Sequence, residues 1–198
     1  MSDETHPSRP SPESRRQQIL DAACERVRQS GFHGASMADI AKAAGLSVGQ
    51  IYRYFENKEA IIAAIVAQDL AEMRDKFAEI ESRPGALLDA IEAHLPEGID
   101  KCFDPRRATL ALEVVAEAAR NPKVAAIVRA ADDQERALAQ TMMGRDRKPE
   151  WSEAEFQARC EVVGMIFDGL LMRGVNHPDL DREALADVLR STVRHLLG

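Results

Sequence analysis

The feature that most restricts the fold of this chain is the repetition of helix start and stop signals along nearly its whole length. Apolar residues recur three and four positions apart, and most such stretches are bounded by Ser, Asn or Asp before them and Gly or Pro after them. This spacing places apolar side chains on one face of an α-helix, whereas strands need an alternating pattern. Runs of alternating Val, Ile, Thr or Tyr are absent from the sequence. The pattern predicts an all-α protein of about nine helices.

The same signals place the helices along the chain. The first helix is expected from about Glu13 to Ser30, where Gly31 ends it, and the Pro/Ser-rich residues 1–12 before it are expected to form a flexible tail. The other helices are expected to start at capping or proline positions, namely Ser36, Ser47, Asn57, Pro84, Asp104, Asn121, Ser152 and Asp181.

Charge is distributed unevenly between the two parts of the chain. Residues 1–58 hold 8 Lys and Arg against 7 Asp and Glu, whereas residues 59–198 hold 18 against 26. The acidic second part is a poor partner for nucleic acid, because phosphates repel it. Contacts with phosphates are therefore expected from a few placed groups in the first part.

Several classes of protein are disfavoured by the sequence. Apolar stretches fall short of the roughly 20 residues that a membrane span needs, and the N-terminus lacks the apolar core of a secretion signal. We therefore expect a cytoplasmic protein with no membrane partner. The three cysteines and five histidines are scattered, without metal-ligand spacing, a nucleophile-base pair or a Gly-rich phosphate loop. No enzyme activity, metal site or cofactor is expected.

Residues 36–55, SMADIAKAAGLSVGQIYRYF, have the pattern of a helix, a tight turn and a second helix. Ala41 is small enough to let the two helices cross closely, and Gly45 supplies the turn. Their shared core is expected from Ile40, Leu46, Ile51 and Phe55. The second helix, from Val48 to Tyr54, would be about 10 Å long. That length suits a DNA major groove about 12 Å wide.

Residues 13–73 resemble the DNA-binding domain of the tetracycline-repressor (TetR) family. The matching residues are Ile19-Leu20, Ala22-Ala23, Gly31-Phe32, Ser36-Met37, Ile40-Ala41, Ala44-Gly45, Ser47, Gly49, Ile51-Tyr52, Tyr54-Phe55 and Lys58-Glu59. Arg26, Val27 and Gln50 depart from the usual residues of the family. The resemblance implies a three-helix DNA-binding head over residues 13–73, with a ligand-binding and dimerisation body over residues 74–198.

The candidate DNA-binding residues divide by their chemistry. Gln50 can offer its amide to adenine, Val48 can touch a thymine methyl group, and Gly49 lets the backbone approach the bases. Donors that suit phosphate oxygens are carried by Ser36, Ser47, Tyr52, Tyr54 and Lys58. Arg53 suits either role. The matched motif places Tyr54 and Lys58 outward.

Each of these roles has a local alternative. Gln50 either reads a base or only closes the capping box of its helix, and Ser36 either contacts DNA or only caps its helix. Tyr52 is either a DNA contact or part of the core. Arg15 and Arg16 either reach the DNA backbone or minor groove, or belong to a solvated helix face.

The family resemblance also implies a homodimer on a palindromic double-stranded operator, with the last two helices as the seam. The candidate interface residues are Phe156, Val163, Phe167, Leu170, Leu171, Leu185, Val188, Leu189 and Leu196. Gly164, Gly169 and Gly174 permit close approach. Alternatively, these apolar stripes serve only the core of one subunit.

A small-molecule pocket in the body is the third implication of the resemblance. Apolar candidates for its lining are Met73, Phe77, Leu88, Ile91, Leu110, Val114, Met142 and Met165, and polar candidates are Glu113, Glu117 and Asp168. The methionines and the sparse charge favour an apolar or aromatic effector. Glu113 and Glu117 alternatively form a solvated face with Arg120, and Asp168 alternatively bonds across the dimer seam.

These expectations predict a repressor that binds its operator as a dimer and is released by a small-molecule effector. In this hypothesis the effector favours a state in which the helix after Asn57 moves and the two heads no longer match the half-sites. Two alternatives keep the same fold: an activator, and an adaptor that binds a partner protein without operator binding.

Overall fold

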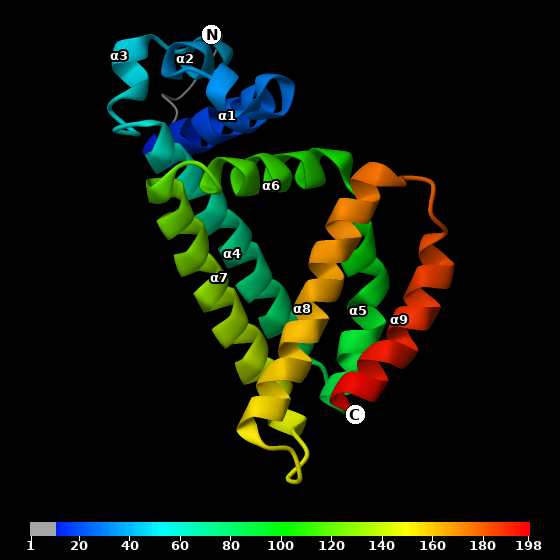
Figure 1. Ribbon diagram of the computed structural model, residues 1–198. Helices are drawn as coiled ribbons and strands as arrows, with labels where there is room; N and C mark the ends of the chain where they lie inside the picture. Colours follow the sequence, from blue (N-terminus) through cyan, green and yellow to red (C-terminus); the bar gives the residue numbers. More distant parts are fainter. Residues whose placement is uncertain (1–10) are drawn as a thin grey trace, which may run out of the picture. The chain divides into compact units, whose positions relative to one another are not determined.

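The computed structural model describes residues 11–198, which form nine α-helices, one 3-10 helix and no strand. The predicted all-α class is confirmed. The helices are α1 (Pro12–Gly34), α2 (Met37–Ala43), α3 (Val48–Ile51), α4 (Lys58–Ser82), α5 (Leu87–Cys102), α6 (Pro105–Ala118), α7 (Pro122–Met143), α8 (Glu153–Asn176) and α9 (Arg182–Leu197), with the 3-10 helix η1 (Gly144–Asp146) between α7 and α8 (Figure 1). Most of the predicted tail lies outside the described residues, but Ser11 caps α1 and Pro12 begins it.

The chain divides into two compact units, which we call the head, up to Ile65, and the body, Val66–Gly198. The division falls inside α4, eight residues before the boundary that the family resemblance suggests. Each unit has its own buried core. None of the helices among the described residues is long and apolar enough to cross a membrane.

Side-chain caps fix the starts of the short helices in the head. Ser36 and Asp39 each accept a hydrogen bond from the other's backbone N–H at the start of α2. Ser47 and Gln50 form the same reciprocal pair at the start of α3. Asn57 accepts a backbone N–H from the first turn of α4, at 2.8 Å. Because each cap satisfies N–H groups that a helix leaves without a partner, these helix starts are the ones that the sequence predicted.

Two helix ends in the head differ from the prediction. Gly31 has a φ of +67° and kinks α1 there, but helical structure resumes and reaches Gly34. The second helix of the motif ends at Ile51 rather than near Phe55. Beyond it the backbone continues in tight turns, with the Tyr54 N–H donating to the Ile51 carbonyl at 3.0 Å. The exit from α3 is therefore less regular than a helix.

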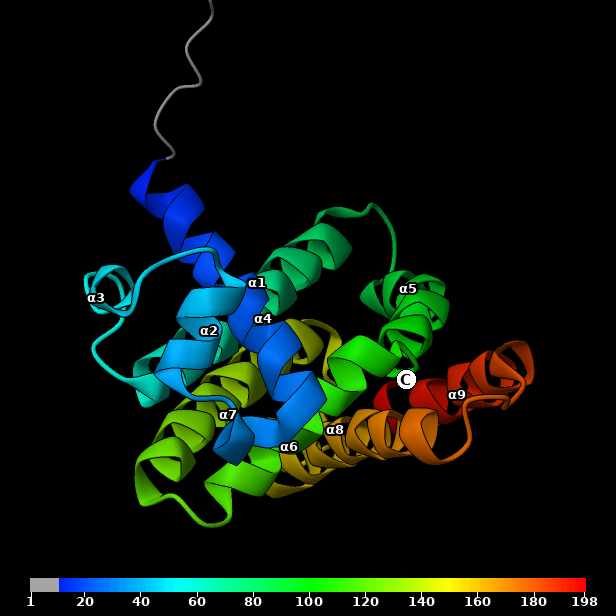
Figure 2. The same ribbon diagram turned by 90° about the horizontal axis from the view of Figure 1, so that it is seen from above.

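The head has a buried apolar core, to which each of its four helices contributes. Its buried residues include Ile19, Leu20, Ala23, Val27, Phe32, Ile40, Ala41, Ile51, Phe55, Ile61, Ile62 and Ile65. Burying one large aliphatic or aromatic side chain stabilises a fold by about 1.5–3 kcal/mol. Within the head α3 lies at the outer edge, next to α2 (Figures 1 and 2). The core thus fixes one face of α3 and leaves the opposite face open.

In the body, α5, α8 and α9 pack side by side (Figure 1). Their shared core contains Leu95, Ile99, Phe103, Leu170, Ala186, Leu189 and Val193. Helix α5 begins at Leu87 and not at Pro84, because Gly85 has a φ of +107°. The free N–H of Leu87 donates to the Asp146 carboxylate at 3.1 Å. Asp146 therefore caps the N-terminus of α5 from a distant part of the chain.

Candidate functional site

The reading segment, which we define as Ser47–Phe55, has one buried and one exposed face. Ile51 is 0% exposed, whereas Val48 is 46% and Tyr52 is 52% exposed. Gly49, Gln50 and Arg53 are also exposed. The structure thus brings the predicted base-reading residues together on the outward face. Tyr52 lies on that face as well, so its alternative role as a core residue is wrong.

Gln50 and Ser36 both serve as caps while remaining exposed. The Gln50 Oε1 atom accepts the Ser47 N–H at 2.8 Å. That bond uses only the amide oxygen, so it does not occupy the two N–H donors of the same amide. The Ser36 hydroxyl accepts the Asp39 N–H at 3.1 Å and also donates to the Asp39 carboxylate. Gln50 can therefore cap and still offer donors, whereas the Ser36 donor already has an acceptor.

Lys58 does not point freely outward as predicted. Its ammonium donates to the Phe32 carbonyl oxygen, and it lies 5.9 Å from the centre of the Phe32 ring. The side chain is half-buried, as is Tyr54. Because a lysine ammonium has three donors, the bond to Phe32 occupies one of them. Lys58 therefore joins the start of α4 to the end of α1.

Arg15 and Arg16 both make hydrogen bonds within the head, although Arg16 remains exposed. The Arg16 Nη1 atom donates to the Tyr54 carbonyl oxygen at 3.2 Å, and the guanidinium lies 4.3 Å from the centre of the Phe55 ring. Arg15 donates to Gln18 at 2.9 Å. The Arg16 contact joins residues 38 positions apart. Helical periodicity gives no signal for a contact of that kind.

Part of the predicted effector site comes together in the body. Phe77 from α4, Ile91 from α5 and Met142 from α7 pack in one cluster with Ile80 and Leu87. On α6, Val114 is buried and Leu110 is half-buried. Met165 is 63% exposed on α8 and is not in this interior. Its inclusion was wrong, because α8 has an outward apolar face as well as an inward one.

The predicted polar anchors differ in their surroundings. Glu117 is only 4% exposed, and its two oxygens accept from Arg120 at 2.9 Å and from Asn121 at 3.3 Å. It is neither a solvated residue nor an open anchor, since it fixes the end of α6. Glu113 is half-buried, and Asp168 is exposed. The pKa of Asp168 is raised, first by partial burial and then by neighbouring carboxylates on α7 and α8.

A cavity of about 500 Å³ lies elsewhere in the body, beside α8 and the end of α9. It is lined by Lys148, Trp151, Arg159, Ser191, Arg194, His195 and Gly198. None of the predicted effector residues is among them. Two of its cations already have carboxylate partners, because Arg159 pairs with Glu155 at 2.8 Å and Arg194 pairs with Glu92 at 2.7 Å.

Most of the predicted dimer residues pack inside their own subunit. Phe156, Val163, Leu170 and Leu189 are buried, and Phe167, Leu171, Leu185 and Leu196 are half-buried. Only Val188 of that set is exposed, at 65%. The exposed large apolar residues on α8 are instead Val162, Met165, Met172 and Val175. No heavy atom of the described residues would crowd a Cβ placed on Gly164 or Gly169. The periodic stripe of α8 therefore belongs to the body core, and a second face of α8 is open.

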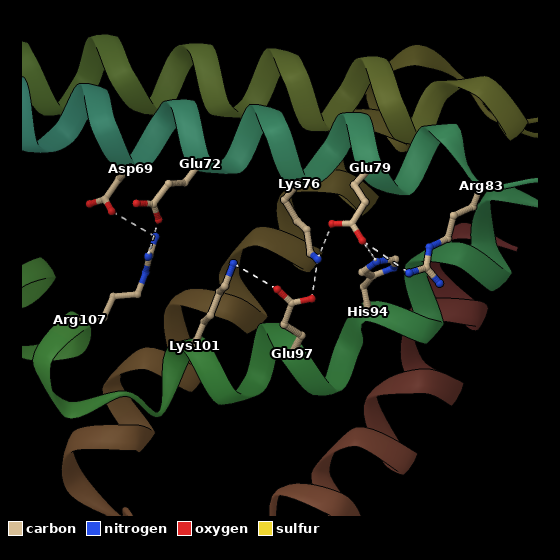
Figure 3. Close-up of polar contacts among 9 residues, drawn as sticks. All are labelled: Asp69, Glu72, Lys76, Glu79, Arg83, His94, Glu97, Lys101 and Arg107. Atoms are coloured by element: carbon tan, nitrogen blue, oxygen red, sulfur yellow. Dashed lines mark hydrogen bonds and ion pairs between the residues drawn. The ribbon is translucent and has the colours of Figure 1, made fainter.

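Figure 3 shows a row of charged side chains between α4 and the helices α5 and α6. We call it the α4 charge ladder, and its members are Asp69, Glu72, Lys76, Glu79, His94, Glu97, Lys101 and Arg107. Arg107 on α6 binds Asp69 at 3.2 Å and Glu72 at 3.1 Å. Partial burial raises the pKa of Asp69, and Arg107 opposes that shift.

The centre of the ladder joins α4 to α5. Lys76 lies between Glu79, at 2.8 Å, and Glu97, at 2.5 Å. The His94 Nε2 atom lies 3.3 Å from Glu79 (Figure 3). Hydrogen bonds from Lys76 and then from His94 lower the pKa of Glu79 to about 2. This ladder was not predicted from the sequence, although charges on α4 recur at the three- and four-residue spacing of one helix face.

The head is similar to a known family of proteins. The family model described as bacterial regulatory proteins, tetR family, matches residues 19–65. The HTH-type transcriptional regulator UidR of Escherichia coli (strain K12) is 36% identical over 118 residues, which cover 58% of this chain and 57% of the regulator. The match thus spans little more than half the length of that curated relative. That relative is named as a transcriptional regulator.

Two solved structures share the fold along almost the whole chain. Salmonella enterica GusR has a TM-score of 0.79 at 24% identity and covers 95% of this chain and 97% of its own. The transcriptional regulator FadR from Bacillus subtilis, solved in complex with stearoyl-CoA, has a TM-score of 0.73 at 20% identity and covers 92% and 97%. The family model matches the head, and these folds also include the body. Residues 19–65 are therefore similar to the tetR family of bacterial regulatory proteins, and the whole chain shares its fold with these solved structures.

Proposed function

We propose that the protein is a DNA-binding transcriptional repressor that reads a palindromic operator as a homodimer and is released by a small-molecule effector. The observation that carries this proposal is the outward face of the reading segment. Val48, Gly49, Gln50, Tyr52 and Arg53 lie there together, while Ile51 and Phe55 anchor the segment in the head core. A short segment with amide, methyl and cationic groups on one exposed face is suited to the major groove.

The direct test is selection of DNA by the purified full-length protein. Genomic fragments that it retains against competitor DNA are sequenced, and binding to the enriched sequence is titrated with salt. We expect enrichment of one two-fold symmetric sequence, with affinity that falls as salt rises. Binding of all fragments alike, or of none, would contradict operator reading.

The proposed dimer uses the outward face of α8 together with α9. Apolar surface is exposed there by Val162, Met165, Met172 and Val188. Contact between this surface and water is unfavourable, and a second copy packed against it would remove that contact. Met165→Glu should place a charge in this seam and produce monomers in sedimentation experiments. Val115→Glu is the matched control, because Val115 on α6 is 59% exposed and lies outside the seam. A dimeric Met165→Glu protein would exclude this seam.

The proposed effector has an apolar part that contacts the cluster of Phe77, Ile91 and Met142. The related fold of Bacillus subtilis FadR holds stearoyl-CoA, which makes that compound the first probe, beside smaller aromatic compounds.

Helix α4 runs from the head into the body, so a ligand that shifts α4 would change the separation of the two reading segments. A compound that binds and raises the thermal stability of the protein should also weaken operator binding. The size of that weakening is set by the difference in the compound's affinity for the operator-binding and released states. If saturating compound leaves operator affinity unchanged, this coupling is absent.

A further inference from the structure

Two side chains of α1 bond to backbone carbonyls on either side of the reading segment. The Gln18 Nε2 atom donates to the Ala44 carbonyl oxygen at 2.7 Å, before the segment begins. The Arg16 Nη1 atom donates to the Tyr54 carbonyl oxygen at 3.2 Å, where the segment ends. We call these two side chains the α1 brace.

Neighbouring contacts orient both members of the brace. Arg15 donates to the Gln18 Oε1 atom at 2.9 Å, so the amide nitrogen of Gln18 is directed to Ala44. The Arg16 guanidinium lies 4.3 Å from the centre of the Phe55 ring, which is itself buried. A planar guanidinium can stack on a ring and donate a hydrogen bond at its edge, whereas a lysine ammonium is a compact charge without that shape.

The reading segment needs such support because its own helix is short. Helix α3 has only four residues. The chain leaves it through tight turns, with the Arg53 N–H donating to Gln50 at 3.2 Å and the Tyr54 N–H to Ile51 at 3.0 Å. A single turn of helix does not fix its own position, and base reading requires side chains held to within about 0.5 Å. Contacts from α1 supply the missing constraint.

We propose that the α1 brace positions the reading segment, so that discrimination between bases depends on Arg16 and Gln18 acting on the protein backbone rather than on DNA. This inference rests on the proposed operator reading. In this role Arg16 is a positioning residue. The competing role for Arg16 is a phosphate contact. That role predicts a different effect of the side chain's charge and a different dependence of operator affinity on salt.

The test compares Arg16→Lys and Arg16→Gln with the matched control Arg28→Lys. Arg28 lies on the same helix and pairs with Glu25 at 2.7 Å, away from the reading segment. Each protein is titrated with the selected operator and with base-substituted operators at several salt concentrations. We expect both Arg16 variants to lose about fivefold in the ratio of operator to substituted-operator affinity, the scale of one lost hydrogen bond, with an unchanged salt slope. Arg28→Lys should match the wild type.

A phosphate contact would give the opposite result. Arg16→Gln would then lower the salt slope by about one with the affinity ratio unchanged, and Arg16→Lys would keep the slope. That pattern would overturn the brace, and so would wild-type behaviour of both variants.

Hydrogen exchange of the DNA-free protein tests the brace independently of operator reading. In both Arg16 variants the backbone amides of Tyr54 and Phe55 should exchange about fivefold faster, while those of α2 keep their rates. In Gln18→Ala, the backbone amide of Leu46 should likewise exchange about fivefold faster. Unchanged exchange at these amides would overturn the brace. A wild-type protein that selects no operator would instead refute the proposed function, and the exchange rates would still decide the inference.

Discussion

The head and the α4 side of the body hold their helices together by different means. In the head, fully buried residues such as Ile51 and Phe55 make an apolar core, and caps such as Ser47 with Gln50 close the helix starts. Along α4 the body instead uses the α4 charge ladder, in which Lys76 and Glu79 pair with residues of α5 (Figure 3). Apolar burial involves no charges that salt could screen, whereas partly exposed ion pairs are weak and screened.

This difference suits the two tasks that we propose. A reading segment must keep one geometry, and the well-packed core, the caps and the proposed α1 brace together supply it. A helix that transmits a signal must have a second arrangement of similar free energy, and exposed ion pairs can exchange partners at little cost. The following predictions test the contrast, beginning with the largest effect.

Core packing in the head should give the largest effect on stability. Ile51→Ala should lower the free energy of unfolding by about 2–5 kcal/mol, because Ile51 is 0% exposed and its loss leaves a cavity. Val48→Ala on the same helix should change it by less than about 0.5 kcal/mol, because Val48 is exposed. Urea denaturation measures both. Equal effects of the two substitutions on stability would mean that the two faces of α3 do not differ in burial.

Base reading by Gln50 should give the next effect. Gln50→Ala should reduce discrimination at one base pair of each half-site by about 1–3 kcal/mol. Gln50→Glu separates reading from capping, since it keeps an oxygen for the Ser47 N–H but loses the amide donors. Affinities for base-substituted operators measure the outcome. Wild-type preferences in Gln50→Glu would leave Gln50 as a cap only.

A phosphate contact by Lys58 should give a smaller change. Lys58→Ala should weaken all operators alike and lower the salt slope by about one, through the ammonium donors that Phe32 does not occupy. Binding measured at four or more salt concentrations gives the slope. A slope equal to that of the wild type would assign Lys58 to the α1–α4 junction alone.

The ladder should give the smallest effect, and one that depends on pH and salt. The pKa of Glu79 is lowered from 4.5 to about 2 by Lys76 and His94. A carboxylate with a lowered pKa stabilises the fold fully above its ordinary value, and the stabilisation is lost as the pH falls through the folded-state value. The stability difference between wild type and Glu79→Gln should therefore be constant above about pH 4.5 and vanish near pH 2.

Salt should reduce the same difference, because screening shortens the reach of exposed charges to about 3 Å at 1 M. Asp75→Asn, on α4 but outside the ladder, is the matched control for the loss of one carboxylate. Urea denaturation of the three proteins at several pH and salt values is the measurement. A difference that persists unchanged at pH 2 and at high salt would show that Glu79 stabilises the body by packing and not by charge.

The parts of the fold that the sequence predicted are those encoded by near neighbours. A cap such as Ser36 with Asp39 involves residues three positions apart, and the periodic apolar residues of a helix mark its buried face. These signals determine the helix starts, the all-α class and the outward face of the reading segment. They are local, so one sequence is enough to recognise them.

The parts that were missed depend on contacts between distant residues. Arg16 meets Tyr54, and Arg107 meets Glu72, 38 and 35 positions apart. Helix α8 carries apolar residues both at Val163 and Leu170, which face its own core, and at Met165, which is exposed. Periodicity shows that such stripes exist, but only packing decides which of them the subunit itself covers.

The most direct test of the central claim is a footprint of the wild-type protein on the DNA that it selects. We expect two protected half-sites related by two-fold symmetry, with centres about one helical turn apart, 34–36 Å. The outward face of the reading segment would then meet both half-sites in the major groove. A single asymmetric protected stretch, or uniform weak protection, would contradict reading by a dimer of this chain.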